Sequence, residues 1–299
     1  MKFFLKKWII VYYNYGRLGN RLHTHANVLG WCLANKYNLL NLSFIEYSDL
    51  FKRGKNNQVY IHIYSRDLLS FIFKIHLVHI FLNKILLSEK WLNRLSIFVK
   101  TICRNENETI NQKEIDQEVI NSNKIVIIKA WDLNFKNALI SCSEQVKEIL
   151  TPKDIFANEA KNQILKLRLK YDFLVGVHAR RSDYREYLHG IHYHSWKSYL
   201  NWIKQISQII EESYNLNAGF LLCSDEQPDA KIFNQLPIHF FCGDQLMTDL
   251  HMLSSCDFIV GPPSSFGTWA SWYGRVPRLC VQKDSFIQSL DQFTISSTC

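Results

Sequence analysis

The chain has 299 residues, of which 47% are apolar and 21% are charged. This ordinary globular composition excludes a chain too polar to bury a core, and the length allows one large domain or two of medium size. The formal net charge of +8 suits an anionic partner, such as a nucleotide phosphate, nucleic acid or an acidic membrane surface, although a surplus of solvated lysines would also explain it.

The eight cysteines form no CxxC pair, and several lie inside apolar runs such as Leu221-Leu222-Cys223. This pattern favours buried free thiols over a disulfide framework or a zinc site. Free thiols are typical of a reducing compartment, so we expect a cytoplasmic protein.

In the first half of the chain, apolar runs alternate with stretches of helical spacing. The pattern predicts strands over residues 8–13, 39–44 and 124–130, and helices over 18–37, 70–102 and 143–150. The polar stretch 104–123 is expected to be an exposed loop.

Residues 68–87 are the only candidate membrane segment. They include Lys74 and Lys84, and charges near a bilayer centre are costly, so a span is not expected. We interpret the segment as a core or domain-packing helix, with peripheral contact to a membrane surface as the alternative.

The second half alternates more regularly between strands and helices. The predicted strands are 173–178, 218–223, 239–242, 257–260 and 278–282, and the predicted helices are 158–171, 196–213, 248–255 and 266–273. Such alternation predicts an α/β fold with parallel sheets and crossover helices. Pro152 marks the expected domain boundary, which gives domains of residues 1–151 and 152–299.

In open α/β sheets, ligands bind beyond the carboxyl ends of the strands. The loop after strand 173–178 contains His178, Arg180, Arg181 and Asp183. A guanidinium group can bind two phosphate oxygens at once and stays charged. Asp183 is placed to orient one of the two arginines. A structural Arg–Asp cluster is the alternative, and these residues alone leave both interpretations open.

Two further loops follow predicted strands. Ser264 and Ser265 precede the helix 266–273, where hydroxyl and backbone N–H groups suit either an anion site or a simple N-cap. Gly16 and Gly19 flank a turn, and two glycines there would allow a ligand to approach the backbone closely. The alternative is a plain strand-to-helix turn without a ligand.

The histidines His189, His192 and His194 lie close together but form no HExxH or similar set, so we expect no metal ion. The chain also has no GxSxG elbow, P-loop or GxGxxG motif, which argues against hydrolases and nucleotide kinases.

Four segments together resemble the superfamily of α1,2-, α1,6- and protein O-fucosyltransferases. Residues 178–184, HARRSDY, resemble its HxRRxD motif, and residues 16–20, GRLGN, resemble its N-terminal loop. Ser224-Asp225 resembles its SD motif, and residues 249–269 resemble its third motif. The matches occur in family order, and the layout is most similar to the bacterial α1,2-fucosyltransferases.

The resemblance implies a GT-B architecture with two Rossmann-like halves. The N-terminal half would be the acceptor-side domain, and the C-terminal half would bind the GDP-sugar donor. It implies an enzyme that transfers L-fucose from GDP-fucose to a hydroxyl of a glycan, with inversion and without a metal ion. GDP-fucose would be a substrate, no other cofactor would be needed, and nucleic acid would not be a partner.

The resemblance also implies roles for individual residues. Arg180 would contact the diphosphate with support from Arg181, and Asn20 would lie near the reacting sugar. The remaining donor-binding residues would be His178 beside the nucleotide, Asp249 near the guanine, Ser264, Ser265 and Phe266 over the phosphates, and Asp225, Gly16 and Gly19. For the base that deprotonates the acceptor, Asp183, Glu186, Asp225 and a phosphate oxygen are all candidates.

The sequence departs from the family pattern at three places. Ser182 replaces a glycine, Arg21 replaces a glutamine, and Pro262 and Pro263 precede the two serines. These departures give no support to an α1,2 linkage. The alternatives are a transferase for another GDP-sugar or a protein acceptor, and a non-catalytic GDP- or glycan-binding relative.

Overall fold

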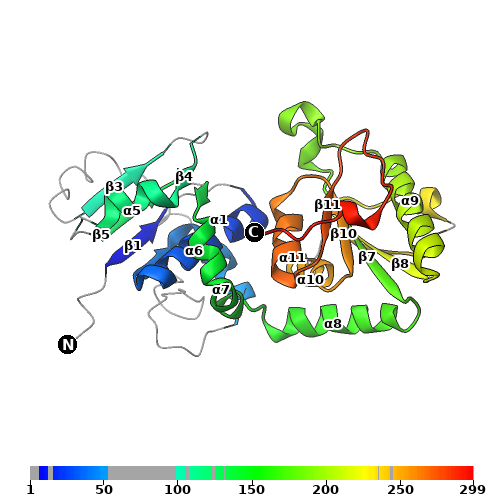
Figure 1. The fold of residues 1–299 in the computed structure, drawn as a ribbon, viewed down its shortest axis with the longest axis horizontal. Coiled ribbons are helices and arrows are strands. Elements are labelled where there is room, and N and C mark those ends of the chain that lie inside the picture. The colour runs from blue at the N-terminus through cyan, green and yellow to red at the C-terminus, as the bar shows by residue number, and fades with distance from the viewer. Residues whose placement is uncertain are drawn as a thin grey trace. The chain divides into compact units, whose positions relative to one another are not determined.

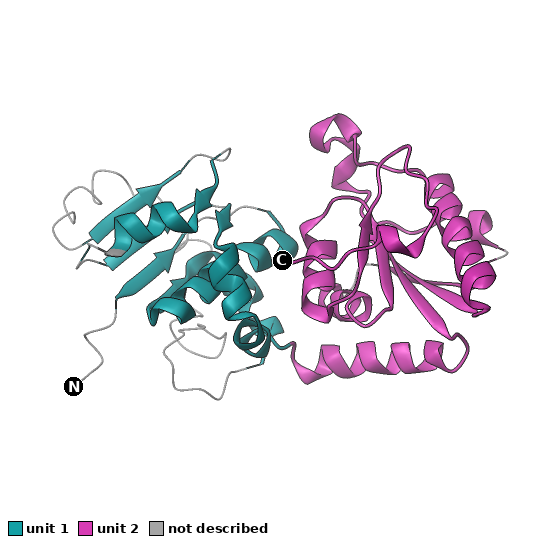
Figure 2. Ribbon diagram, in the orientation of Figure 1, with its two compact units in different colours: residues 1–151 teal, residues 152–299 magenta. Residues whose placement is uncertain are grey.

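The computed structural model describes residues 7–12, 16–52, 99–104, 108–120, 122, 125–130, 132–234, 236–242 and 245–298. The chain divides into two compact units, Met1–Thr151 and Pro152–Cys299 (Figure 2). Each unit has its own parallel sheet with helices packed on it, and each is described here by itself.

Unit 1 contains a four-stranded parallel sheet in the order β2-β1-β5-β3 (Figure 1). Its strands are β1 (Trp8–Val11), β2 (Asn38–Asn41), β3 (Val99–Cys103) and β5 (Ile125–Lys129), and a small second sheet pairs β4 (Ile110–Asn111) with β6 (Leu133–Asn134). The helices are α1 (Leu18–Asn35), the 3₁₀ segment η2 (Leu42–Leu50), α5 (Gln112–Ile120), α6 (Lys136–Ser141) and α7 (Ser143–Ile149).

Unit 2 contains a five-stranded parallel sheet in the order β11-β10-β7-β8-β9. Its strands are β7 (Phe173–Ala179), β8 (Ala218–Ser224), β9 (Ile238–Cys242), β10 (Phe258–Gly261) and β11 (Arg278–Cys280). The helices are α8 (Asp154–Arg168), α9 (Trp196–Tyr214), α10 (Leu246–Leu253) and α11 (Ser265–Gly274), with short 3₁₀ segments η4 (Asp183–Arg185), η5 (Tyr187–Gly190), η6 (Ala230–Phe233) and η7 (Leu290–Gln292).

The two faces of the unit 2 sheet are covered by different helices, because side chains alternate along a strand. On one face, Val175 and Val177 of β7 belong to an apolar cluster with Ile203 and Ile206 of α9. On the other, β7 approaches α10 so closely at Gly176 that a Cβ there would lie 2.7 Å from Leu253. His178, two residues further on, continues this second face.

The strand order of unit 2 places a topological switch point between β7 and β10. From β7 the chain builds outward through β8 and β9, then crosses to the other side of β7 to form β10 and β11. Loops that leave neighbouring strands in opposite directions open a crevice at the carboxyl ends, which is where open α/β sheets bind ligands.

The α/β fold with parallel sheets and flanking helices, expected from the sequence, is confirmed. Two local predictions are wrong. The helix predicted over 70–102 ends in a strand, since Val99–Cys103 is β3 and pairs with β5. The predicted loop 104–123 contains β4 and α5, because Ile115 and Val119, four residues apart, give α5 a narrow buried stripe that is easily missed in a polar sequence.

Residues 68–87 lie outside the described part of the chain. Within the described part, no helix is long and apolar enough to cross a membrane. The cysteines there are free, as predicted, and Cys32, Cys223 and Cys256 are buried, whereas Cys103 and Cys280 are exposed.

Candidate functional site

The aromatic rings of His178 and Phe266 stack across the switch point of unit 2. Their centroids lie 5.2 Å apart with an angle of 28° between the planes. His178 is the next-to-last residue of β7, and Phe266 lies in the first turn of α11. The pair therefore links the end of the central strand to the helix that follows β10.

The imidazole of His178 is only 7% exposed, and its Nδ1 has no hydrogen-bond partner among the described residues. Burial, together with the positive charges of Arg278 and Arg180, lowers the pKa of His178 to about 3. The ring is thus neutral at physiological pH. Its surroundings favour negative charge, which is what a phosphate-binding site requires.

The guanidinium of Arg180 is fixed by a two-pronged contact with Asp183. Nε donates to Oδ1 at 3.0 Å and Nη2 donates to Oδ2 at 2.5 Å. The guanidinium carbon also lies 4.6 Å from the centre of the Tyr184 ring, in a cation–π contact. Because the side chain of Arg180 is 18% exposed, the arginine is oriented by its neighbours and still reaches solvent.

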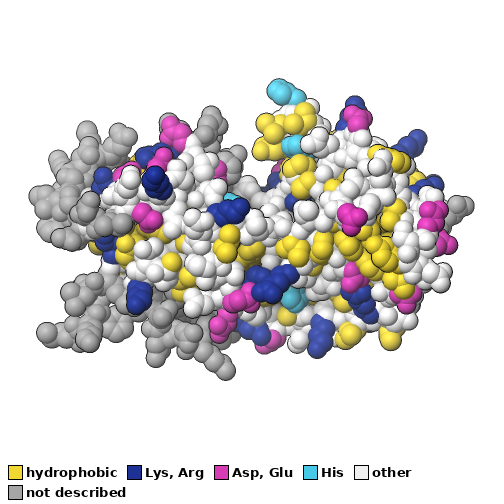
Figure 3. Space-filling view, viewed as in Figure 1, with side chains coloured by type: hydrophobic (Ala, Val, Ile, Leu, Met, Phe, Trp, Pro, Cys, Tyr) yellow, Lys and Arg dark blue, Asp and Glu magenta, His cyan; other side chains and the backbone are white. Residues whose placement is uncertain are grey.

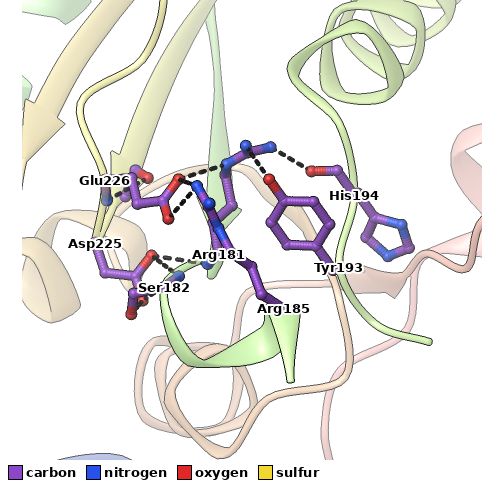
Figure 4. Close-up of polar contacts among 8 residues, drawn as sticks. Arg181, Ser182, Arg185, Tyr193, His194, Asp225 and Glu226 are labelled. Atoms are coloured by element: carbon purple, nitrogen blue, oxygen red, sulfur yellow. Dashed lines mark hydrogen bonds and ion pairs between the residues drawn. The ribbon is translucent and has the colours of Figure 1, made fainter. Parts of the chain in front are cut away.

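The guanidinium of Arg181, by contrast, makes hydrogen bonds to other residues of unit 2 (Figure 4). Its Nε donates to Glu226 at 3.1 Å, its Nη1 donates to the carbonyl of His194, and its Nη2 donates to the Tyr193 hydroxyl at 2.5 Å. The guanidinium also lies 4.1 Å from the centre of the Trp196 ring. Contacts on every side of this group suit a residue that holds the loop in place.

Asp225 joins the end of β8 to the turn after β7 (Figure 4). Its carboxylate accepts from the backbone N–H of Arg181 at 2.7 Å and from the Ser182 hydroxyl at 2.5 Å. Serine at position 182, where the family pattern has glycine, therefore adds a hydrogen bond to this turn. Glu226, next in the chain, pairs with both Arg181 and Arg185.

The start of α11 is held by its own N-cap and by the segment that follows β7. Ser264 is the N-cap, and its hydroxyl accepts from the Phe266 N–H at 3.2 Å. The Tyr184 hydroxyl donates to the Pro263 carbonyl at 2.5 Å. Ser265 is the first residue of the helix, so the first-turn N–H groups and the positive end of the helix dipole lie beside the His178–Phe266 pair.

Arg278 lies on the β11 side of the same helix start and is 6% exposed. Its Nη2 donates to the Pro262 carbonyl at 2.6 Å, and its Nη1 donates to the Thr268 hydroxyl at 3.0 Å. Asp249, which the resemblance places near the guanine, lies in α10 and is 8% exposed.

The remaining predicted residues belong to unit 1. Gly16 has a φ of +72°, a conformation that favours glycine, and a Cβ there would lie 2.3 Å from the Asn20 amide nitrogen. Arg21 donates to the Gly16 carbonyl at 3.1 Å and pairs with Glu46 at 3.0 Å. Gly19 is buried in the first turn of α1. These residues lie together at the start of α1.

The three clustered histidines serve different contacts rather than a common centre. His194 is buried and meets Trp202 edge to face at 5.0 Å, His192 packs near Tyr184 at 5.9 Å, and His189 lies in η5. Among the residues that the structure describes, no group of three or more His, Cys, Asp or Glu is placed to hold a metal ion. On the face shown in Figure 3, basic and acidic side chains are interspersed rather than gathered in a basic stripe.

Sequence reasoning missed several residues of this site. Glu226, Tyr193, Trp196 and Arg278 were not singled out. Arg278 carried a usable signal, because a charged residue that opens a short apolar strand must have a specific environment. Glu226 and Tyr193 carried none, since their role depends on contacts across the sheet edge.

No protein-family model matches the chain, and no curated protein sequence matches it. Among solved structures, a mutant of Arabidopsis thaliana FUT1 in complex with GDP matches with a TM-score of 0.63 at 14% identity, over 94% of this chain and 71% of that chain. This chain therefore has the expected GT-B type fold with two Rossmann-like halves.

Two other similar structures have TM-scores below 0.5. The fucosyltransferase NodZ from Bradyrhizobium has a TM-score of 0.48 at 14% identity, over 92% of this chain and 94% of that chain. POFUT1 in complex with GDP-fucose has a TM-score of 0.49 at 13% identity, over 90% of this chain and 94% of that chain. The fold assignment rests on the likeness to FUT1.

Proposed function

We propose that the chain is a glycosyltransferase that moves L-fucose from GDP-fucose to a hydroxyl of a glycan acceptor, with inversion and without a metal ion. The observation that carries the proposal is Arg180, which Asp183 and Tyr184 orient at the switch point beside the start of α11. The GT-B type fold and the GDP held by the similar FUT1 structure support it.

The arrangement suits a diphosphate leaving group. As the bond to the sugar breaks, negative charge builds on the departing GDP while the sugar becomes oxocarbenium-like. A fixed guanidinium and the positive end of the α11 dipole would stabilise that charge more strongly in the transition state than in the ground state. Cationic side chains and a helix N-terminus would then perform the neutralising role that a metal ion has in other transferases.

We assign the other site residues to support and shape. Arg181 and Asp225 would hold the turn that presents Arg180, because their polar groups contact that turn and its neighbours. His178 and Phe266 would form an aromatic wall beside the nucleotide, with Ser264 capping the helix. Asp249 would lie near the guanine, and Asn20, Gly16 and Gly19 would contribute to binding of the donor sugar.

For the acceptor base, the three candidate carboxylates Asp183, Asp225 and Glu186 have different contacts. Asp183 is paired with Arg180, and Asp225 accepts from the turn after β7. Glu186 is exposed and takes no part in these arginine contacts. We therefore favour Glu186 over the other two, with a phosphate oxygen of the donor as the remaining candidate.

The proposal is tested by incubating the protein with GDP-fucose and a glycan array, followed by linkage analysis of any product. Transfer to a glycan hydroxyl without added metal is the expected result, and an acceptor in a cytoplasmic pathway would fit the expected location. Preference for a UDP-sugar in a parallel donor panel would overturn the donor assignment. Tight GDP binding without turnover on any acceptor, protein or glycan, would indicate a non-catalytic relative.

A further inference from the structure

Arg278 is a buried cation without a carboxylate partner among the described residues. Its two hydrogen bonds go to neutral oxygens, those of Pro262 and Thr268, and its Nε has no partner there. Burial of an uncompensated charge is unfavourable. Two other arginines of unit 2 do have carboxylate partners. Arg168 pairs with Asp257 at 2.6 Å, and Arg181 pairs with Glu226 at 3.1 Å.

The position of this charge is specific. A Cβ on Gly267 would lie 2.9 Å from the Arg278 Nε, so the guanidinium packs directly against the first turn of α11. Its two hydrogen bonds tie the carbonyl before that helix to a hydroxyl inside its first turn. Arg278 thereby fixes the start of α11 against β11.

Arg278 also acts on the ligand-facing side of the site. Its charge, like that of Arg180, lowers the pKa of the His178 imidazole in addition to the effect of burial. The His178–Phe266 pair is therefore flanked by a cation on the β11 side, a cation on the β7 loop and the positive end of α11. Asp183 pairs with Arg180 and Asp225 partly offsets the effect on His178, but no carboxylate among the described residues pairs with Arg278.

We propose that Arg278 is a positioning residue for a diphosphate: it fixes the start of α11 against β11 and supplies a buried positive charge that the bound diphosphate compensates. This inference deepens the proposed function and rests on it for the identity of the nucleotide. It implies that the free protein carries an electrostatic cost that anion binding removes, so that ligand binding and Arg278 are coupled.

The experiment compares Arg278→Met, which removes the charge, and Arg278→Lys, which keeps it, with the wild-type chain. Binding of GDP, guanosine and inorganic pyrophosphate is measured by calorimetry on folded protein. For Arg278→Met we expect GDP and pyrophosphate affinity to fall about 10- to 100-fold with guanosine affinity unchanged, since the variant loses a positive charge that attracts the phosphates and the contacts that hold the start of α11. Arg278→Lys should recover part of the loss.

Arg168→Met is the matched control, because it removes an arginine whose charge Asp257 already compensates. It should lower the unfolding temperature and leave GDP affinity unchanged. Equal losses for GDP and guanosine in Arg278→Met, or no loss for either, would overturn the inference. If Arg278→Met does not fold, Arg278→Gln takes its place, because glutamine keeps a hydrogen-bond donor without the charge. Wild-type pyrophosphate affinity in Arg278→Gln would then overturn the inference.

The outcomes for the two proposals are separable. Pyrophosphate binding that depends on Arg278, in a protein that transfers no fucose, would overturn the proposed function and support this inference. Fucosyl transfer by the wild-type chain, with wild-type pyrophosphate affinity in Arg278→Met, would support the proposed function and overturn this inference.

Discussion

Arg180 and Asp183 form a two-pronged ion pair across three residues of the same loop, with Nε–Oδ1 at 3.0 Å and Nη2–Oδ2 at 2.5 Å. Such a pair fixes the plane of the guanidinium before a ligand arrives, so less rotational freedom is lost on binding. It also assigns both oxygens of Asp183 to the arginine, which favours an orienting role for this carboxylate over that of a base.

The first prediction concerns Arg180. Arg180→Ala should lower the rate of fucosyl transfer by at least about 100-fold, because one fixed donor to the developing charge is lost. The measurement is steady-state turnover with GDP-fucose, with circular dichroism to establish that the variant is folded. Arg185→Gln is the control, since Arg185 is an exposed arginine of the same loop that pairs with Glu226. Near-wild-type turnover in Arg180→Ala would refute the assigned role.

The second prediction separates two roles for Asp183. If Asp183 orients Arg180, Asp183→Asn should weaken GDP binding and slow turnover together, because the misplaced guanidinium serves both. If Asp183 were the acceptor base, GDP affinity would stay at the wild-type level while turnover fell by about 100- to 10,000-fold. Parallel measurement of the GDP dissociation constant and kcat decides between them, and we expect the first pattern.

The third prediction concerns acid stability and His178. Its pKa falls from the ordinary value of 6.5 to about 3 in the folded chain, chiefly because the ring is buried. The unfolded chain therefore takes up a proton that the folded chain excludes. Above pH 6.5 this group does not affect the free energy of unfolding. As the pH falls from 6.5 toward 3, the free energy of unfolding decreases by at most about 1.4 kcal/mol per pH unit because of His178.

His178→Phe removes the titrating group and keeps an aromatic ring opposite Phe266. The variant should lose less stability than the wild type between pH 6.5 and 4, as measured by denaturant unfolding at a series of pH values. His194, His239 and His251 also have lowered pKa values, chiefly through burial, and contribute equally to both proteins. Parallel acid profiles for the two proteins would contradict the assignment.

Much of unit 2 could be predicted from the sequence, because its strands are unbroken apolar runs and its helices keep a clear apolar stripe. The loop of Arg180 could be found for the same reason, since adjacent charges at a strand end are conspicuous. The partners of Arg181 could not, because the His194 carbonyl and the Glu226 carboxylate are 13 and 45 residues away along the chain. Only the parallel pairing of β7 with β8 brings Glu226 to this edge.

The same limit explains why residue type alone does not separate Arg180 from Arg181, to which only the resemblance gave different roles. Arg180 and Arg181 are neighbours, but consecutive residues at a strand end point to opposite sides. Arg180 turns toward Asp183 and Tyr184, whereas Arg181 is enclosed by Tyr193, Trp196 and Glu226. A sequence pattern of two arginines thus contains one ligand candidate and one structural residue, and only side-chain contacts distinguish them.

The fourth prediction tests whether the close approach of β10 to β7 matters for the site. A Cβ on Gly261, at the carboxyl end of β10, would lie 2.5 Å from the His178 carbonyl oxygen. Because that oxygen belongs to the backbone of the neighbouring strand, Gly261→Ala must displace His178 or the loop before α11. We expect a loss of about 1–3 kcal/mol of stability, with weaker GDP binding to the protein that remains folded.

Gly219→Ala provides the matched control for this displacement. A Cβ there would lie 2.4 Å from the Tyr171 ring, a clash of similar severity near the amino end of β8. It should lower the free energy of unfolding to a comparable extent and leave GDP affinity per folded molecule unchanged, because the ligand edge of the sheet lies at the opposite ends of the strands. Equal weakening of GDP binding in both variants would mean that affinity follows global stability, and that the β7–β10 contact has no special part in the site.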